Sequence, residues 1–241
     1  MKRLIIIGLI ALVLTSCVIH VGYQPDGDLE YYNEALLYQV CDFSQLQVST
    51  STATIELEGS DDNHIDLVVG FYEYTPGDAV IYIENGTIKA RSASGKQVLI
   101  TEISGEIPQW LDLKVSNASG NIDISDMQDS QQIYISNASG DFFMEDSQAA
   151  EIDIQVGSGK VYLVDNAAYE IKIRAGSGDV YLQDSEVTEI EIEAGSGDVT
   201  FEDSELINGS VTTGSGDIIL KNTEAGYVKY RVGSGEIKHL H

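Results

Sequence analysis

A repeat of nineteen residues organises the second half of the chain. Glycine ends a Gly-Ser-Gly or Ala-Ser-Gly motif at Gly120, Gly140, Gly159, Gly178, Gly197, Gly216 and Gly235. The first step between these glycines is twenty residues long and every later step is nineteen. A fixed period of this length is typical of solenoids, in which each repeat is one structural unit that packs against its neighbours.

Each repeat contains two short segments in which apolar residues alternate with other residues. Alternation with a period of two predicts strands that bury one face. The same positions stay apolar from repeat to repeat, so we expect two walls that face each other across a continuous core. One wall is predicted to comprise Ile122/Ile124, Phe142/Met144, Val161/Leu163, Val180/Leu182, Val199/Phe201 and Ile218/Leu220. The facing wall is predicted to comprise Leu113/Val115, Ile133/Ile135, Ile152/Ile154, Ile171/Ile173, Ile190/Ile192 and, with a defect, Gly209/Val211.

The residues between these segments are suited to tight corners. Glycine adopts positive φ angles without steric cost, so the Gly-Ser-Gly motifs fit one corner. Pairs such as Asp146-Ser147 and Asp184-Ser185 fit the other, where short polar side chains cap turn amides. The fold class predicted is all-β, a single-stranded parallel β-helix, or β-solenoid, with nineteen-residue coils. Seven or eight coils at about 4.8 Å each would form a rod roughly 35 Å long.

Upstream of residue 113 the alternation is present but irregular. Strands are expected at 54–58, 64–72, 79–84, 87–91 and 97–102, with a tight turn or hairpin at Glu84-Asn85-Gly86-Thr87. This segment should cap the solenoid, since terminal coils are usually atypical. The domain boundaries predicted are a signal peptide at 1–16, a tether with a possible short helix over Leu29–Val40 at 17–44, and the solenoid at 45–241, with regular repeats from about 113.

The first residues have the features of a bacterial export signal. Lys2 and Arg3 precede an apolar run from Leu4 to Leu14, which is too short to span a membrane, because spanning needs about 20 residues. The motif Leu14-Thr15-Ser16-Cys17 resembles the lipobox of bacterial lipoproteins. The resemblance implies cleavage before Cys17 and acylation of that cysteine, which would anchor the chain to a membrane through several acyl chains. An ordinary secretory signal is the alternative interpretation.

Charge and cysteine content exclude some partners and bonds. Without residues 1–16, 11 of the 13 basic residues remain against 39 acidic ones, a net charge of −28. Such a surface repels nucleic acid and anionic headgroups, so neither is expected as a partner. Cys41 is the only cysteine after Cys17, so no internal disulfide is predicted, and its thiol is expected to be buried and inert.

The combination of an irregular β segment, an Ile107-Pro108 entry and repeated Ser-Gly-Asp motifs resembles the bacterial putative-adhesin family of β-helix proteins of unknown function. The resemblance covers about residues 45 to 241. It implies a right-handed parallel β-helix at the cell envelope, and it supplies no functional residues to transfer to this chain.

Two rows of acidic residues are candidates for cation binding. Asp146, Asp165, Asp184 and Asp203 recur every nineteen residues, as do Asp179, Asp198 and Asp217. Carboxylates about 4.8 Å apart repel one another, and Ca²⁺ would relieve that repulsion. The chain lacks the nine-residue repeat of calcium-binding β-rolls, and Lys160 interrupts the second row. Solvated carboxylates at turns are therefore the preferred interpretation, with calcium as the alternative and no other cofactor expected.

One outward row of aromatic residues is the candidate ligand surface. Phe143, Tyr162 and Tyr181 lie nineteen residues apart and are followed by Thr200 and Ile219. They could bind a glycan or a partner protein, or they could stack on each other and stabilise the sheet. The sequence does not decide between these alternatives.

No enzyme is predicted. Polysaccharide-cleaving β-helices build a cleft from loops inserted between coils, and the regular repeats leave no room for such loops. The chain also lacks a Gly-x-Ser-x-Gly or His-Glu-x-x-His motif. The function expected is a non-catalytic, adhesin-like or structural binding module, lipid-anchored at the cell envelope, with the outer membrane of a Gram-negative bacterium as its location. A periplasmic scaffold or envelope-stress accessory protein is the main alternative.

Overall fold

The chain forms a rod made of strands only. The computed structural model describes residues 29–240 together with the backbone of residues 17–22. Within these ranges the secondary structure is entirely β, and no helix is long and apolar enough to cross a membrane. The predicted signal peptide at 1–16 lies outside the described residues.

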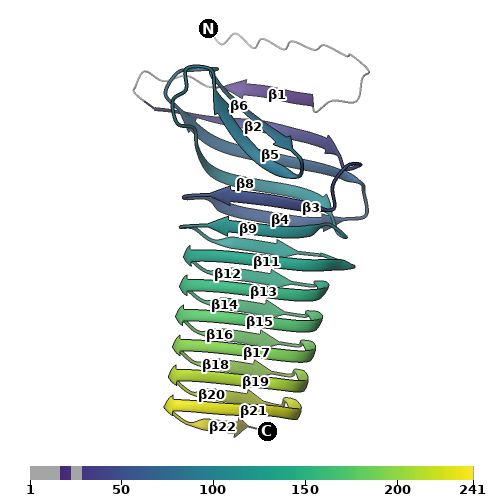
Figure 1. Ribbon diagram of the computed structural model, residues 1–241, viewed down its shortest axis with the longest axis vertical. Helices are drawn as coiled ribbons and strands as arrows, with labels where there is room; N and C mark the ends of the chain where they lie inside the picture. Colours follow the sequence, from purple (N-terminus) through teal and green to yellow (C-terminus); the bar gives the residue numbers. More distant parts are fainter. Residues whose placement is uncertain (1–16, 23–28, 241) are drawn as a thin grey trace.

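Two long sheets face each other along the rod (Figure 1). The twelve-stranded sheet has the order β1-β2-β5-β8-β4-β10-β12-β14-β16-β18-β20-β22. Its strands are β1 (Cys17–Gly22), β2 (Glu30–Gln39), β5 (His64–Glu73), β8 (Leu99–Pro108), β4 (Thr54–Ser60), β10 (Ile122–Ser125), β12 (Phe142–Glu145), β14 (Val161–Val164), β16 (Val180–Gln183), β18 (Val199–Glu202), β20 (Ile218–Lys221) and β22 (Ile237–Leu240).

The ten-stranded sheet has the order β21-β19-β17-β15-β13-β11-β9-β3-β7-β6. Its strands are β21 (Glu224–Ser234), β19 (Glu205–Ser215), β17 (Glu186–Ser196), β15 (Ala167–Ser177), β13 (Gln148–Ser158), β11 (Ser130–Ser139), β9 (Asp112–Asn117), β3 (Gln45–Thr50), β7 (Thr87–Ser92) and β6 (Ala79–Glu84).

The predicted fold class is confirmed by the regular coils. From β9–β10 to β21–β22, each coil contributes one strand to each sheet, and every strand pairs in parallel with its equivalent in the next coil. Ile133 pairs with Ile152, and Val161 pairs with Val180, so the register advances by nineteen residues. The strand register therefore reproduces the sequence repeat.

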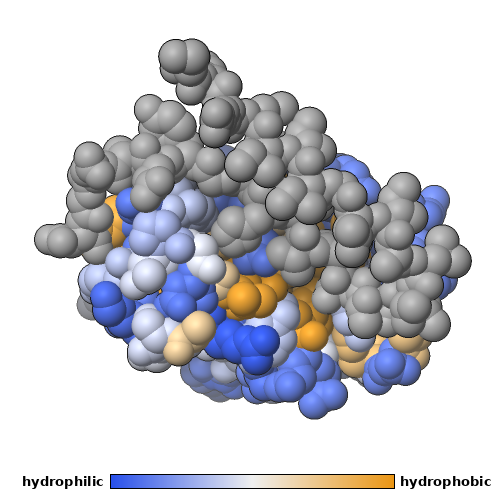
Figure 2. All heavy atoms as spheres, turned by 90° about the horizontal axis from the view of Figure 1, so that it is seen from above, coloured by the Kyte–Doolittle hydropathy of each residue, from blue (hydrophilic) through white to orange (hydrophobic). Residues whose placement is uncertain are grey.

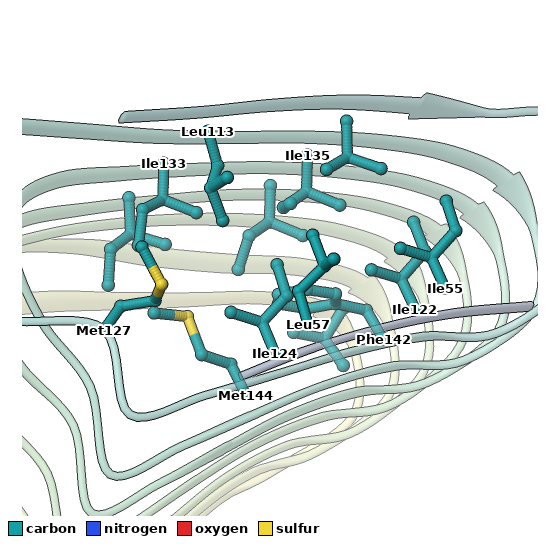
Figure 3. Packing of buried hydrophobic residues seen from close by; sticks show 14 of the residues in the cluster. Ile55, Leu57, Leu113, Ile122, Ile124, Met127, Ile133, Ile135, Phe142 and Met144 are labelled. Carbon is teal, nitrogen blue, oxygen red and sulfur yellow. The ribbon is translucent and has the colours of Figure 1, made fainter. Parts of the chain in front are cut away.

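The predicted walls form the core. All their apolar residues are buried, and Figure 3 shows the two walls meeting, with Leu113, Ile133 and Ile135 on one side and Ile122, Ile124 and Phe142 on the other. Met127 and Met144 fill the space near the Asp-Ser corner (Figure 3). Because the apolar residues alternate along each strand, every second side chain is buried in this core. The buried apolar surface stabilises the short coils without a disulfide.

The first coil of the solenoid lies well upstream of the regular repeat. Leu46 of β3 pairs with Leu113, and Ile55 of β4 pairs with Ile122, so residues 45–60 form a coil in register with the next one. The chain then leaves the solenoid and returns to it at β9. The sequence predicted the strand at 54–58 but not that it belongs to the coil stack.

The residues inserted between these coils form the cap. β5 pairs antiparallel with β2 and β8, while β8 pairs in parallel with β4, so the cap extends the twelve-stranded sheet beyond the first coil. The predicted tight turn is confirmed: β6 and β7 form a hairpin, and Asn85 and Gly86 have φ angles of 51° and 74°. Both angles are typical of a type I′ turn.

The helix predicted over Leu29–Val40 is wrong, because these residues form strand β2. Pairing with β5 over its whole length satisfies its backbone, and burial alternates so that Tyr32, Glu34 and Leu36 point inward. This tertiary pairing outweighs the helix propensity of Glu, Ala and Leu. The 17–44 segment is therefore not simply a tether, since β1 and β2 both belong to the sheet.

The prediction of a buried thiol at Cys41 is also wrong. The side chain is exposed, just after β2, while the preceding Val40 is buried. Desolvation and the neighbouring Asp42 carboxylate raise the pKa of the thiol. A raised pKa lowers the fraction of the thiolate, which is the reactive form of a cysteine.

Candidate interaction surfaces

The first acidic row occupies the corner that follows each short strand. Asp146, Asp165, Asp184 and Asp203 have φ angles of 48°, 54°, 49° and 49°, in the left-handed region. Aspartate and asparagine tolerate this region better than other residues with a side chain. The side chains are exposed. Backbone geometry therefore explains why aspartate recurs there.

The residue after each of these aspartates caps the turn from inside the rod. Ser147 Oγ accepts a hydrogen bond from the Met127 amide at 3.1 Å, and Ser185 Oγ accepts one from the Asn166 amide at 3.3 Å. The Ser147 amide in turn donates to Asn166 Oδ1 at 3.2 Å. Each of these side chains is buried. Together with Ser204 they form a polar ladder that satisfies one amide per coil. Turn capping was predicted for these pairs, and the serine or asparagine supplies it.

The second acidic row caps the glycine corner. The backbone amide of Asp198 donates to Asp179 Oδ1 at 3.1 Å, and the amide of Asp217 donates to Asp198 Oδ1 at 2.8 Å. The amide of Glu236 donates to Asp217 Oδ1 at 2.8 Å. Each carboxylate therefore binds the amide of the next coil. Lys238 also contacts Asp217, and this hydrogen bond lowers the pKa of the Asp217 carboxyl.

Neither row forms a compact metal centre. The described residues contain no group of three or more His, Cys, Asp or Glu side chains arranged to hold a metal ion. The second row already uses one oxygen of each carboxylate for a backbone amide. Calcium binding stays a prediction for the exposed first row, where only the spacing of the carboxylates favours it.

The predicted aromatic row is brought together on the twelve-stranded sheet. Phe143 pairs with Tyr162, and Tyr162 with Tyr181, on adjacent strands. The Tyr162 and Tyr181 rings stack with centroids 5.0 Å apart and an interplanar angle of 8°, and the Phe143 and Tyr162 centroids are 6.2 Å apart. The three side chains are half-buried.

Polar neighbours occupy the end of this row. Lys160 Nζ lies 5.6 Å from the centroid of the Tyr181 ring and 3.4 Å from Asp179 Oδ2, and the Tyr181 hydroxyl donates to the same oxygen at 3.3 Å. Burial, followed by the charge of Asp179, raises the pKa of Tyr181. Because the rings contact each other and a lysine, much of their surface is already used within the protein. The structure favours the stabilising interpretation of this row.

An exposed aromatic residue that the sequence did not single out lies on the other sheet. The Tyr169 side chain is 63% exposed, and among the described residues it has no hydrogen bond and no ring partner. Tyr169 lines a hollow of about 500 Å³ that spans β11 to β19. Ile207, 48% exposed, and the carboxylate residues Glu186 and Glu205 also line it.

The local strand geometry explains the hollow. In β15, Ala168 is buried and both Tyr169 and Glu170 point outward, which interrupts the alternation at a bend. Ala149 and Ala150 of the preceding coil and Ala167 of β15 itself lie around this bend, and these small side chains leave the space open. The interrupted alternation at Tyr169 was the feature of the sequence that could have indicated this exposed tyrosine. The equivalent positions in the neighbouring repeats are Ala150 and Thr188, so Tyr169 does not belong to a recurring row of aromatic residues.

A second depression, of about 820 Å³, follows the glycine corner. Small residues such as Ala138, Gly157 and Gly176 line it, with Gln155 and Arg174 beside them. None of the exposed large apolar side chains of the described residues lies there. The hollow beside Tyr169 is therefore the one of the two that offers large exposed apolar side chains, Tyr169 and Ile207.

The predicted lipidation site lies at the cap end of the rod. The Cys17 backbone pairs with Leu37 in the antiparallel pair β1–β2, and β1 is the outer strand of the twelve-stranded sheet. β22 lies at the opposite end of the rod (Figure 1). Viewed from the cap end, apolar surface is visible among polar residues (Figure 2), and exposed side chains of the cap include Leu37, Val68 and Tyr74.

Solved structures share this fold. A structure from Bacteroides fragilis, described as a putative adhesin, is 16% identical, with a TM-score of 0.58, over 91% of this chain and 100% of that one. A second, from Parabacteroides distasonis, described as a putative lipid binding protein, is 14% identical, with a TM-score of 0.51, over 90% of this chain and 98% of that one. At these identities the similarity establishes the fold alone.

Family membership rests on the sequence. No curated protein is similar enough to this chain to count as a relative. The family resemblance noted in the sequence is confirmed, because the family described as Toastrack DUF4097 matches residues 40–239, which include the first coil, the residues inserted after it and the regular coils. The chain is therefore a member of the Toastrack DUF4097 family.

Proposed function

We propose that this protein is a non-catalytic, adhesin-like binding module, lipid-anchored at the cell envelope, that binds a protein or glycan on the side of its rod. The hollow beside Tyr169 is the observation that carries the proposal. An unpartnered, exposed tyrosine on an otherwise regular surface offers apolar contact at little conformational cost. The carboxylates of Glu186 and Glu205, which also line the hollow, would accept hydrogen bonds from the ligand.

The position of Cys17 supports the anchoring part of the proposal. Lipid on the cap end would hold that end at the membrane and leave the coils free to project from it. Val18 follows the cysteine, and by resemblance to enterobacterial lipoproteins a residue other than aspartate there favours the outer membrane. A non-catalytic role agrees with the descriptions of the two structural neighbours, which name an adhesin and a binding protein.

Site-specific photo-cross-linking in intact cells tests the ligand surface. We expect Tyr169→benzoylphenylalanine to yield a covalent adduct with another envelope or host molecule upon irradiation. Tyr74→benzoylphenylalanine is the matched control, because Tyr74 is 48% exposed in the cap and does not line the hollow. No adduct at position 169, or equal adducts at both positions, would rule out the hollow as the binding surface.

Two cellular measurements test the location. Cys17→Ser should release the protein to the soluble fraction or leave an uncleaved precursor, and a processed, membrane-bound variant would contradict lipidation. Protease added to intact cells should digest a surface adhesin. Protection from protease would instead favour the alternative, a periplasmic scaffold or envelope-stress accessory protein.

A further inference from the structure

The last coil exposes side chains that every earlier coil buries. Ile237 occupies the inward position held by Val199 and Ile218, yet it is 41% exposed where those two are fully buried. On β21, Val228, Tyr230 and Val232 continue the facing wall and are only partly buried. Among the described residues nothing covers this end, whereas the cap covers the other (Figure 1). The end of the rod is thus an open cross-section of the core.

The backbone at this end also lacks partners. Along the glycine corner, backbone amides of each coil donate to carbonyls of the next coil. The Gly197 amide donates to the Ser215 carbonyl at 3.0 Å, and the Gly216 amide donates to the Ser234 carbonyl at 3.2 Å. The amides of Ile218 and its equivalents follow the same rule. The next donors in the two series are the amides of Gly235 and Ile237, and no described coil follows to accept their hydrogen bonds. Unpaired strand edges of this kind are templates for pairing with another chain.

One side chain at this end is also unsatisfied. The Tyr230 hydroxyl is buried without a hydrogen-bond partner among the described residues. Burial raises the pKa of Tyr230 to about 12. A hydroxyl placed this way costs free energy unless a partner group reaches it.

Charge at this end differs from charge along the rod. Residues 186–204, two coils earlier, carry seven acidic residues and no Lys or Arg. Residues 224–240 carry Glu224 and Glu236 against Lys229, Arg231 and Lys238, a net charge of +1. Two copies of this strongly acidic protein therefore meet with least repulsion at this end, where their acidic coils point away from each other.

We propose that β21 and β22 form a self-association surface, on which a second copy of the chain docks end to end. A two-fold axis perpendicular to the rod makes each edge strand antiparallel to the edge strand it meets, because the axis reverses the second rod. Antiparallel pairing lets the free amides and carbonyls of the two copies satisfy each other, and the apolar ends cover each other. The same surface serves both copies.

End-to-end docking also determines where the lipid anchors of the two copies lie, given the proposed lipidation of Cys17. End-to-end docking places the two caps at opposite ends of a double-length rod. Two lipid anchors would then lie too far apart for one membrane and would suit copies on two facing membranes. The protein would in this way adhere to itself between cells.

Sedimentation velocity of the full chain over a range of concentrations tests the proposal, in density-matched detergent if the chain carries lipid. We expect a concentration-dependent dimer, and at least a tenfold weaker association for Ile237→Lys, which puts a charge at the centre of the contact. Val80→Lys is the matched control, since Val80 is 37% exposed on β6 at the cap end of the rod, and it should associate like the wild type. A monomer at all concentrations, or equal effects of the two variants, would overturn the proposal.

Hydrogen exchange gives a second measurement that needs no variant. The Gly235 and Ile237 amides should exchange more slowly as the concentration of the wild-type chain rises, while the exposed loop amides near Gly95 should not change. If the end amides exchange at the same rate in the dimer and the monomer, the dimer forms elsewhere and the proposed surface is wrong. This measurement also decides the matter if Ile237→Lys disturbs the last coil. Neither result depends on lipidation or on the hollow beside Tyr169.

Discussion

Aspartate and serine share one corner of the coil but meet different demands. Asp184 supplies a left-handed backbone angle, with φ 49°, and its side chain is exposed. Ser185 is buried and supplies the hydroxyl that binds the Asn166 amide and donates to the Gln183 carbonyl at 2.8 Å. The pair was predicted from its recurrence, but which member faces the core depends on the backbone angle at the first.

Ser185→Ala should destabilise the protein by about 1–3 kcal/mol, because the buried Asn166 amide would lose its acceptor. Urea unfolding followed by circular dichroism measures this difference. Asp184→Asn is the control, since asparagine tolerates the same backbone angle, and it should change the free energy of unfolding by less than about 0.5 kcal/mol. An unchanged stability for Ser185→Ala would mean that water replaces the hydroxyl.

At the scale of single strands, the glycine that interrupts the apolar wall on β19 has a structural cause. Gly209 occupies an inward position where other coils carry isoleucine, and its φ is 137°. A Cβ atom there would lie 1.9 Å from the Ile190 carbonyl oxygen, a contact that backbone movement alone can relieve. With this φ angle a Cβ atom would point at the backbone of β17, so the position has no room for a side chain.

Gly209→Ala should therefore destabilise the protein by about 2 kcal/mol or more, from strain in the backbone as well as the clash. Ser210→Ala on the same strand points outward and should have an effect of less than about 0.5 kcal/mol. Thermal unfolding of both variants, analysed with the same baseline, gives the comparison. If alanine at 209 were neutral, this strand would have to shift without cost.

At the scale of the whole molecule, strand pairing in the regular coils joins only successive coils among the described residues. Such a stack is nearly one-dimensional, so its stability is close to a sum over coils and their interfaces. The cap is the exception, since it joins strands from 30–39, 64–73 and 99–108 in one sheet. It covers one end of the rod, while β21 and β22 at the other end have no further strand beside them among the described residues.

Removal of one complete coil tests this organisation. Deletion of 167–185 joins Asn166 to Glu186 and keeps every later coil in register, so we expect a folded rod with a lower melting temperature. Deletion of β15 alone, 167–177, removes one wall segment and should prevent cooperative folding. Circular dichroism and thermal unfolding distinguish the outcomes. If the coil deletion also failed to fold, the coils would depend on one another over longer distances than nearest neighbours.

The period of nineteen residues and the alternation within it determined the coils, their register and both walls of the core. These are local regularities, and stacking of identical units leaves one arrangement that buries all of them. Three features were decided by the tertiary structure alone. Residues 30–39 became a strand because β5 was available to pair with them, and residues 45–60 joined the coil stack across an inserted cap. The aromatic row at Tyr162 stacked on itself while Tyr169 stayed exposed. Each depends on contacts that the spacing of the repeat does not by itself specify.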